Sequence, residues 1–337
     1  MDGWFESGLV ADNNSVAKII TTSSWHDGGG TRAQLGEAVR TGALIRLRRG
    51  VVADAAGADP TALHRLRIEA AAPLLGPDTV FGHESGAVLH KLPLLAPRLE
   101  EVIAVRTAGS HGAIAPNLHT RRGSYEAADL TVVDGLPVTT LDRTVADLIR
   151  RLPFPEAVMV ADAGVRAGLQ KSALLNRTAK GRGCRMARAA VDFADARSES
   201  AGESLSRVRI LRTGVSAPRL QEKVFDLVGR FLGRVDFWWD EAGVAGEFDG
   251  IQKYVKFLEP GQRPEDVIRA EKRREQELIA AGVRVLRWGW SDLWDGTLEV
   301  RLKSMLSRTP VPNAERAFRT SGFAEGYGTG AGPRRDR

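Results

Sequence analysis

The segment that most constrains the fold runs from residue 233 to residue 250 and reads GRVDFWWDEAGVAGEFDG. Two short apolar runs, Val235–Trp239 and Val244–Phe248, flank a polar, glycine-containing stretch, Asp240–Gly243. Apolar runs of this length on either side of a short turn sequence are typical of two antiparallel strands. The pattern therefore predicts a β-hairpin.

Acidic residues gather on this predicted hairpin. If the turn centres between Glu241 and Ala242, Asp236 in the first arm lies directly opposite Glu247 in the second. Because side chains alternate between the faces of a strand, Asp249 shares the face of Glu247. Like charges across a ladder destabilise it, and a divalent cation with oxygen ligands offsets them. The alternative is a solvated acidic hairpin that holds no ion.

A helix predicted at residues 265–281 carries charges on the stripe that faces the sheet. Val267, Glu271, Arg274 and Leu278 are four, three and four residues apart, and this spacing places them on one stripe. Charges in such a place need partners. We expect Arg274 to reach the acidic patch of the hairpin; the alternative is that both charges lie at the edge of the stripe with their heads in water.

A fourth carboxylate is expected from Glu203, on a helix predicted at residues 198–213. A helix-borne Glu, an Asp on one strand and a Glu-x-Asp on the next form an oxygen-ligand set for Mg²⁺ or Mn²⁺. Such a metal generates hydroxide from bound water and stabilises a pentacoordinate phosphorane. That chemistry needs basic residues to hold the phosphodiester, and the neighbourhood supplies Lys253, Lys256, Lys272, Arg273, Arg274 and Arg287.

Composition narrows the class of protein. The 337 residues are enough for two or three domains, and a net charge of +6 with a pI near 9.7 favours a polyanionic partner. The single cysteine, Cys184, excludes an intrachain disulfide and a cysteine-cluster metal site. The N-terminal sequence lacks the basic start of a signal peptide, and no apolar run reaches the roughly 18–20 residues of a membrane span. We expect a cytoplasmic protein without a membrane partner.

Residues 14–58 predict a winged-helix DNA-binding domain. A short helix is expected at Ser15–Thr22, a polar break at Ser23–Gly30 and a second helix at Thr31–Thr41. The following segment, ALIRLRRGVVAD, alternates apolar and basic residues about Gly50, as a two-stranded wing does. The residues expected to face DNA phosphates or groove edges are Gln34, Arg40, Arg46, Arg48 and Arg49. The alternative is a small capping domain with a solvated basic strand.

The whole chain predicts a multidomain α/β protein. A flexible leader is expected at residues 1–13, a mixed α/β domain at 60–195, a third domain at 197–308 and a disordered tail at 311–337. The third domain is expected in the order αβββαβα. Besides the hairpin and the two helices given above, its elements are a strand at Glu222–Val228, a strand at Val283–Trp288 and a helix at 291–306.

The third domain resembles a PD-(D/E)XK nuclease, a restriction-endonuclease-like fold, of the DUF559 or very-short-patch-repair type. The resemblance covers about a third of the chain and rests on Glu203 in SAGES, on RVDF and EFDG in the hairpin, on EKRRE at 271–275 and on GVRVLRWGWSDL at 282–293. It implies metal-dependent cleavage of a phosphodiester, with Asp236 and Glu247 as metal ligands and Glu203 as an outer or second-metal ligand. Glu271 and Arg274 complete the expected catalytic set, and Lys272 and Arg273 the expected DNA contacts.

One position departs from that family. Asp249 stands where the (D/E)XK pattern has its lysine. Relatives of the DUF559 type also carry Asp there, often followed by a His, whereas this chain has Lys253 and Tyr254 in that neighbourhood. Lys253 is therefore a candidate for a migrated catalytic lysine.

The first 150 residues resemble actinobacterial proteins with an AbiEi-like antitoxin N-terminal region. The resemblance rests on residues 35–53, 81–95 and 135–148, which read LGEAVRTGALIRLRRGVVA, FGHESGAVLHKLPLL and GLPVTTLDRTVADL. It implies a winged-helix domain and a middle domain that, in antitoxins, supports repression or toxin neutralisation.

Three functions remain open from the sequence. The first is a DNA endonuclease with a role in defence or repair, targeted by the winged helix and dependent on Mg²⁺ or Mn²⁺. The second is a non-catalytic DNA-binding regulator or antitoxin, with a cognate toxin as partner, in which the nuclease fold is a scaffold. The third is an RNA-processing nuclease that uses the same site chemistry.

Overall fold

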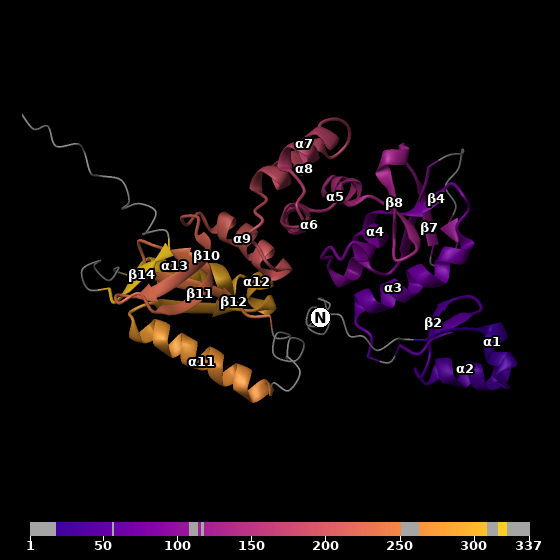
Figure 1. Ribbon diagram of the computed structural model, residues 1–337, viewed down its shortest axis with the longest axis horizontal. Helices are drawn as coiled ribbons and strands as arrows, with labels where there is room; N and C mark the ends of the chain where they lie inside the picture. Colours follow the sequence, from indigo (N-terminus) through magenta and orange to yellow (C-terminus); the bar gives the residue numbers. More distant parts are fainter. Residues whose placement is uncertain are drawn as a thin grey trace, which may run out of the picture. The chain divides into compact units, whose positions relative to one another are not determined.

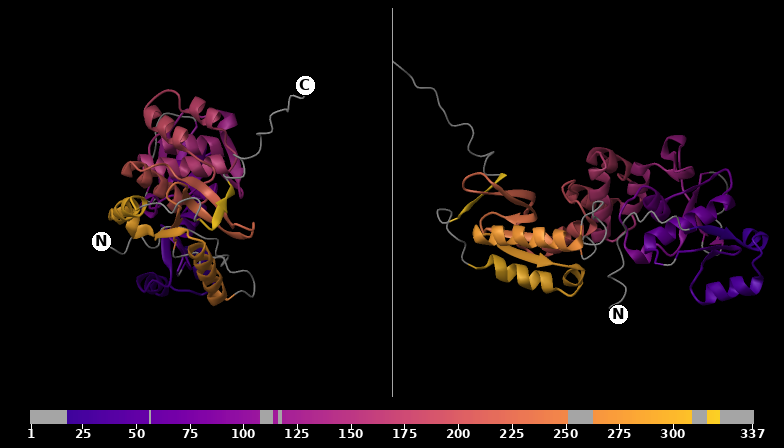
Figure 2. Two further views of the ribbon diagram at one scale, coloured as in Figure 1. Left: turned by 90° about the vertical axis from the view of Figure 1, so that its left-hand side faces the viewer. Right: turned by 60° about the horizontal axis from the view of Figure 1, so that its bottom comes forward.

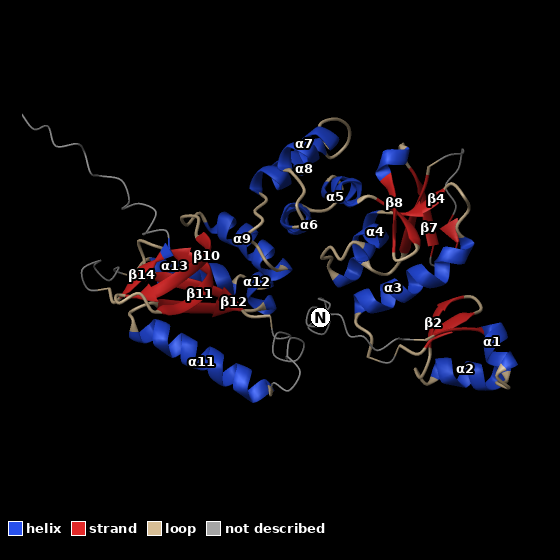
Figure 3. Cartoon of the chain, in the orientation of Figure 1, coloured by secondary structure: helices blue, strands red, loops and turns tan. Residues whose placement is uncertain are grey.

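The computed structural model describes residues 18–55, 57–107, 114–115, 118–250, 263–308 and 316–321. The chain forms two compact units, Met1–Ala196 and Arg197–Arg337 (Figures 1 and 3). The boundary between them falls where the sequence places the start of the third domain. Both units mix helices with sheets, as predicted. The predicted leader lies outside the described residues.

The first unit begins with a small sheet and two helices. Its strands lie in the order β1-β3-β2, and β3 pairs antiparallel with both neighbours. The Thr31 side chain accepts from the Gln34 amide and begins the second helix. The elements are β1 (Ile19–Thr21), α1 (Thr22–Asp27), α2 (Arg32–Arg40), β2 (Ile45–Arg48) and β3 (Val51–Ala53). The predicted second helix and basic hairpin are thus present.

The prediction of a helix at Ser15–Thr22 was wrong for its described part. Ile19–Thr21 is a strand, and the helix begins at Thr22, within the stretch predicted as a break. Two β-branched isoleucines suit a strand, and the Thr21 side chain accepts from the Ser24 amide to start the helix after them. The cap therefore lies near the end of the segment predicted as helix, and most of the helix itself lies in the segment predicted as a break.

The small sheet shares a hydrophobic cluster with the segment that follows it. Leu47, Val51 and Ala53 of the sheet pack with Leu66 and Ala70 of α3 (Pro60–Ala71). Asp59, the predicted boundary, caps α3 by accepting from the Thr61 and Ala62 amides. Residues on both sides of position 59 therefore belong to one packed core.

A six-stranded sheet forms the rest of the first unit, in the order β6-β7-β5-β4-β9-β8. The pairs β4–β9 and β5–β7 are parallel and the others antiparallel. Its strands are β4 (Thr79–Phe81), β5 (Val102–Arg106), β6 (Ile114–Ala115), β7 (Leu118–Arg122), β8 (Leu130–Val133) and β9 (Leu136–Thr139). The further helices of the unit are α4 (His83–Leu89), α5 (Leu141–Ile149), α6 (Phe154–Arg166), α7 (Lys171–Arg177) and α8 (Cys184–Phe193).

The second unit is built on a five-stranded sheet in the order β13-β12-β11-β10-β14. Among the strands described in this sheet, β12 and β13 pair in parallel and the other pairs are antiparallel. The strands are β10 (Arg219–Asp226), β11 (Phe231–Trp239), β12 (Val244–Phe248), β13 (Arg284–Trp288) and β14 (Phe318–Thr320). The second arm of the predicted hairpin, Val244–Phe248, is β12.

Helices cover both faces of this sheet. α11 (Pro264–Ala280) buries Leu278 in one cluster with Val235 and Trp238, while Trp288 donates from its indole to Ser206 of α9 (Ala201–Thr213). In Figure 2, α11 in orange and α13 (Thr297–Leu306) in yellow-orange lie on opposite sides of the sheet. The predicted order αβββαβ is the order of α9, β10, β11, β12, α11 and β13.

Two predictions near the C-terminus were wrong. The helix expected at 291–306 is two helices, α12 (Trp290–Trp294) and α13, because Gly296 takes a left-handed conformation with φ +82°. Within the tail predicted to be disordered, Phe318–Thr320 is a strand that pairs with Val224–Asp226. Phe318 packs edge-on against Trp238, so a buried aromatic contact holds this short strand.

Among the helices that the structure describes, none combines the length and the apolar character needed to cross a lipid bilayer.

A buried histidine links three elements of the first unit. The His64 ring on α3 lies 2.9 Å through Nδ1 from the Leu99 carbonyl and 3.0 Å through Nε2 from the Ser85 hydroxyl. The Ser85 oxygen accepts from the Ile103 amide at 2.8 Å. Both ring nitrogens are therefore used by a neutral imidazole, and burial lowers the pKa of His64 to about 4.

Stability of the first unit should therefore depend on pH. A histidine whose pKa is lower in the folded than in the unfolded state stabilises the fold above pH 6.5, and this contribution is lost as the pH falls towards 4. We expect His64→Gln to lower stability at pH 7 and to reduce the acid slope by up to about 1.4 kcal/mol per pH unit. Hydrogen exchange of the Val102–Arg106 amides at pH 7 and pH 5 measures it. An unchanged slope would contradict the assignment.

Candidate functional site

The two predicted metal ligands lie at the same level of neighbouring strands. The register pairs Phe237 with Gly246, so Asp236 and Glu247 occupy the next position, as predicted from the turn. Ladder pairing between the strands ends there. The Asp236 carboxylate instead accepts from the Phe248 amide at 3.0 Å. The Asp236 carboxylate therefore replaces a backbone carbonyl as the acceptor for the Phe248 amide.

Glu247 is buried inside the sheet and held by two arginines. It is 7% exposed, and its two oxygens lie 2.8 Å from Arg274 and 2.7 Å from Arg287. Burial raises the pKa of the Glu247 carboxyl, and the two guanidinium groups oppose the rise. The predicted contact between Arg274 and the acidic patch is thus present, and both carboxylate oxygens face a permanent cation.

Arg287 gathers acidic side chains around one guanidinium group. It lies beside Glu247 in the parallel register of β12 and β13. Its nitrogens are 2.9 Å from Glu271, 3.5 Å from Glu275 and 3.9 Å from Asp249. Burial lowers the pKa of Arg287, but the carboxylates around it raise that pKa more, so it stays charged. Glu271 therefore pairs with Arg287, a partner that the sequence argument did not name for it.

Glu203 lies in the first turn of α9 and faces the sheet. It is 4% exposed, and it accepts from the Ser200 hydroxyl at 2.8 Å and from the Glu199 amide at 2.9 Å. Ser200 in turn accepts from the Glu203 amide. Ser200 therefore caps the helix through its hydroxyl oxygen, and the same hydroxyl donates to the Glu203 carboxylate. This role of Glu203 at the helix start was not predicted from the sequence.

A residue that the sequence argument missed, Gln221, joins the carboxylates. Its Nε2 lies 2.9 Å from Glu203 and 3.3 Å from Asp236. Gln221 sits in β10 opposite Asp236 in the register, and its φ is +56°. Positive φ is uncommon for a residue other than glycine, and such strain gathers at functional sites. A glutamine in a strand gives no sequence signal for this conformation.

The pattern of side chains along β11 changes at Asp236. Val235 and Trp238, three residues apart, share the cluster of Leu278, whereas Phe237 packs against the Trp288 ring. Regular alternation would put Val235 and Phe237 on one face. The regular alternation of side chains between the two faces of the sheet is therefore interrupted at Asp236.

The remaining candidates of the second unit lie around this centre. The Asp249 amide donates to the Trp288 carbonyl at 2.8 Å, and the Asp249 side chain is 36% exposed. Lys272 and Arg273 are exposed on α11. Lys253 lies outside the described residues. Together the structure brings Glu203, Asp236, Glu247, Glu271 and Arg274 close to the β11–β12 ladder, with Asp249 at its edge.

The predicted DNA contacts of the first unit divide into two groups. Arg46 and Arg49 are exposed on the β2–β3 hairpin. Three others make bonds within the chain: Gln34 accepts from the Thr31 amide, Arg40 pairs with Glu37 at 2.6 Å, and Arg48 donates to the Ala70 carbonyl. Arg46 and Arg49, together with Arg40, whose side chain is 74% exposed despite its pair with Glu37, are therefore the candidates whose charge faces solvent.

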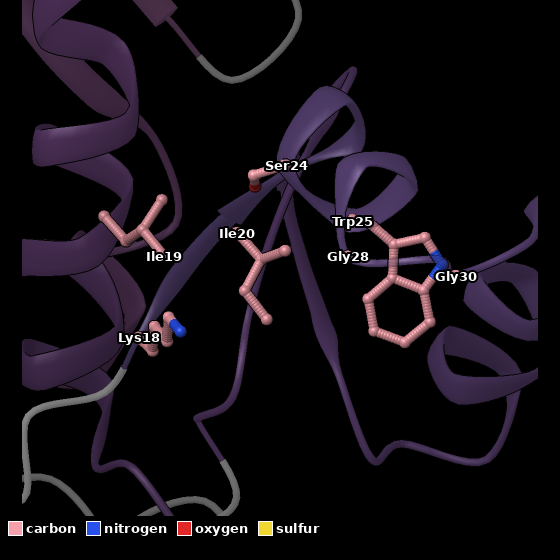
Figure 4. Close-up of a pocket in the computed structure, with 7 residues that line it drawn as sticks. All are labelled: Lys18, Ile19, Ile20, Ser24, Trp25, Gly28 and Gly30. Carbon is pink, nitrogen blue, oxygen red and sulfur yellow. The ribbon is translucent and has the colours of Figure 1, made fainter.

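A hollow of about 280 Å³ lies beside the first strand (Figure 4). The Trp25 ring forms one wall and donates from its indole to the Thr31 carbonyl at 3.0 Å. The lining residues are Lys18, Ile19, Ile20, Ser24, Trp25, Gly28 and Gly30. These lining residues include no carboxylate, so the hollow offers no acidic ligand for a metal.

The carboxylates of the second unit are the candidate ligands for a divalent cation. The structure places no group of three His, Cys, Asp or Glu side chains in metal-binding geometry among the described residues. Glu247 presents both oxygens to guanidinium groups, whereas Glu203 and Asp236 are bridged by a neutral amide. The amide oxygen, Gln221 Oε1, is buried and makes no hydrogen bond within the described structure. Carboxylate and amide oxygens are the kind of hard ligand that Mg²⁺ and Mn²⁺ take.

Comparison with known proteins identifies relatives but no activity. No known family's sequence model matches the chain. The chain is 28% identical over 270 residues to the Mycobacterium tuberculosis proteins MT2308 and Rv2248, both described as uncharacterized, and the match spans 75% of this chain and 96% of each relative. The crystal structure of the RV2827C protein from Mycobacterium tuberculosis aligns with a TM-score of 0.34 at 15% identity, over 56% of this chain and 74% of that chain.

Removal of the Arg287 charge should destabilise the second unit. Arg287→Met leaves the buried Glu247 with one cationic partner, and we expect a loss of about 3 kcal/mol in the free energy of unfolding. Adding Glu247→Gln removes the buried charge and should restore part of the loss. The control is Arg301→Met, because Arg301 pairs with Asp292 at 3.5 Å and is 43% exposed; it should change stability by less than about 1 kcal/mol. Urea unfolding measures all three, and equal effects of the two single variants would contradict the role of Arg287.

Proposed function

We propose that this protein is a divalent-metal-dependent endonuclease that cleaves DNA through its second unit and binds DNA through its first. The observation that carries the proposal is the bridged pair Glu203–Gln221–Asp236 beside the buried Glu247. A buried oxygen-rich cluster on a sheet, next to a helix with exposed basic residues, is suited to phosphodiester hydrolysis.

The architecture supports the finer fold assignment within this proposal. The order α9–β10–β11–β12–α11–β13, with a parallel β12–β13 pair, is compatible with a restriction-endonuclease-like domain. The helices α1 and α2, followed by the β2–β3 hairpin, are compatible with a winged helix. We assign the two units these folds as part of the proposal.

Glu203 and Asp236 are the residues that would hold Mg²⁺ or Mn²⁺. The metal would supply a hydroxide from bound water and neutralise charge that develops on the phosphate. Arg274 and Arg287 fix the Glu247 carboxylate next to this pair. Lys272 and Arg273 are exposed on the helix that carries Arg274 and would hold backbone phosphates. Lys253 stays a candidate for the catalytic lysine that Asp249 replaces.

Plasmid nicking tests this function. Purified full-length protein with Mg²⁺ or Mn²⁺ should nick supercoiled DNA, and EDTA, Asp236→Asn or Glu247→Ala should abolish the activity. Glu265→Gln is the matched control, because Glu265 is an exposed carboxylate on the same unit and should leave nicking unchanged. Retained nicking in Asp236→Asn would sink the proposal, and cleavage of single-stranded RNA instead of DNA would favour the RNA-processing alternative.

One observation favours a second function, that of a non-catalytic DNA-binding regulator or antitoxin. Both Glu247 oxygens are already paired with guanidinium groups, and Asp249 stands in place of a lysine. A protein of this kind would use the first unit to bind an operator and would have a toxin protein as partner. Its second unit would be a scaffold stabilised by arginines in place of a metal.

Gel shifts with a panel of DNA sequences test the second function. It predicts sequence-selective binding in EDTA. Arg46→Ala with Arg49→Ala should weaken that binding and lower the slope of log affinity against log salt by about one for each lost phosphate contact. The control is Arg166→Ala, because Arg166 is an exposed arginine on α6 of the same unit and is not among the expected DNA contacts. Binding without sequence preference would count against this reading.

A further inference from the structure

We propose that the segment formed by α7, α8 and the loop between them is a further nucleic-acid contact of the first unit, in addition to the β2–β3 hairpin. The inference rests on the proposed function, in which this unit binds DNA, and adds a surface to it. Residues 171–193 include six basic residues and one acidic residue, Asp192. α7 and α8 pack against each other, and the loop that joins them begins the most basic part of the segment (Figure 1).

Four exposed basic side chains make up what we call the α7–α8 patch: Lys180, Arg182, Arg185 and Arg188. None of these four side chains makes an ion pair with another residue that the structure describes. The other two basic residues of the segment have partners within the chain. Arg177 pairs with Asp129 and Asp142, and Lys171 donates to the Asp192 carbonyl at 3.2 Å. The patch is therefore the part of the segment whose charge is available to a partner.

Other arginines of the first unit are matched with carboxylates. The guanidinium groups of Arg65, Arg98, Arg143 and Arg177 each lie 2.5 to 3.0 Å from a carboxylate oxygen. In the α7–α8 patch, by contrast, like charges are grouped and repel one another, which disfavours the folded state. A polyanion that binds across the patch removes this repulsion.

A fifth arginine holds the loop of the patch in place. Arg150, at the end of α5, donates through Nε to the Arg182 carbonyl at 3.2 Å and through Nη2 to the Lys180 carbonyl. Gly181 and Gly183 take left-handed conformations with φ +92° and +80°. A Cβ atom at Gly183 would lie 2.0 Å from the Arg150 carbonyl oxygen, so this position needs glycine. Arg150 therefore fixes the loop and adds its own positive charge behind it.

The chemistry of the patch favours a nucleic-acid backbone over a protein or a lipid surface. Three of its four cations are guanidinium groups, whose planar donors match phosphate oxygens. Protein interfaces are centred on buried apolar anchors, and interfacial helices insert apolar side chains into lipid. Within residues 171–193 Met186, at 38%, is the one exposed large apolar side chain. Contacts to phosphates carry no base information, so this surface should add affinity without sequence preference.

The salt dependence of nucleic-acid binding tests the inference. Full-length protein in EDTA is titrated onto labelled duplex DNA and onto labelled duplex RNA over a range of NaCl, and binding is followed by fluorescence anisotropy. The patch variant carries Lys180→Gln, Arg182→Gln, Arg185→Gln and Arg188→Gln. We expect its slope of log affinity against log salt on DNA to be lower by about 0.9 for each lost phosphate contact, and equally so for unrelated DNA sequences.

Two further proteins serve as controls. The first removes the same numbers of arginines and lysines from exposed positions outside the patch, and it should keep the wild-type slope: Arg122→Gln, Arg212→Gln, Arg301→Gln and Lys303→Gln. The second keeps the charge of the patch and should also keep the slope: Arg182→Lys, Arg185→Lys and Arg188→Lys. The thermal midpoint checks that each variant folds. Should the patch variant fail to fold, Arg185→Gln with Arg188→Gln replaces it, with about half the expected change.

The outcomes separate this inference from the proposed function. A slope of the patch variant equal to that of the wild type on both duplexes, or a loss of slope as large in the charge-matched control, overturns the inference and leaves the proposed nuclease intact. A lower slope on RNA alone supports the inference and identifies RNA as the source of the phosphates. Weaker binding of the patch variant to phosphatidylserine vesicles, with unchanged nucleic-acid binding, overturns it. Absence of plasmid nicking, with the lower slope present, contradicts the proposed nuclease alone.

Discussion

The second unit depends on the ion pair between Glu247 of β12 and Arg287 of the neighbouring edge strand β13. A carboxylate that is 7% exposed is costly unless cations and hydrogen bonds surround it. Arg287 meets this need from the neighbouring strand, and it extends to Glu271 and Glu275 of α11. The pair therefore fixes both the register of β12 against β13 and the position of α11 on the sheet.

The candidate site arises where this regular sheet is interrupted. Gln221 takes a positive φ in β10, and β11 changes facing at the opposite residue, Asp236. Strain of this kind costs of the order of 1 kcal/mol or more and persists only where its surroundings enforce it. Hydrogen bonds hold this strained conformation in place. Gln221 donates to Glu203 and Asp236, and the Phe248 amide donates to Asp236. The strained conformation brings Gln221 within hydrogen-bond distance of both Glu203 on α9 and Asp236 on β11.

Sequence reasoning succeeded where local chemistry decides the structure. The turn at Asp240–Gly243 sets the hairpin register, and the stripe on α11 directs Arg274 to Glu247. It failed where tertiary contacts decide. Phe318–Thr320 is a strand because Phe318 packs against Trp238. The local sequence of the glycine-rich tail contains no pattern that predicts this contact. Two signals were visible and were not used: the Asp295–Gly296 pair that separates α12 from α13, and the Ser200-x-x-Glu203 cap. The role of Gln221 has no local signal, because glutamine rarely adopts positive φ.

The charges of the site separate the two proposed functions. Around β12, Arg274 and Arg287 pair with Glu247, and Arg287 also lies near Asp249, Glu271 and Glu275. The contact that joins Glu203 to Asp236 is of another kind, because it is the neutral amide of Gln221. A scaffold that had replaced its metal by arginine would be expected to place a guanidinium group between these two acids as well, because like charges at short range disfavour each other. Gln221 is also the residue at which β10 takes a positive φ. A neutral amide at a strained position between two acids is what the metal-binding proposal expects, whereas the scaffold proposal gives no reason for it.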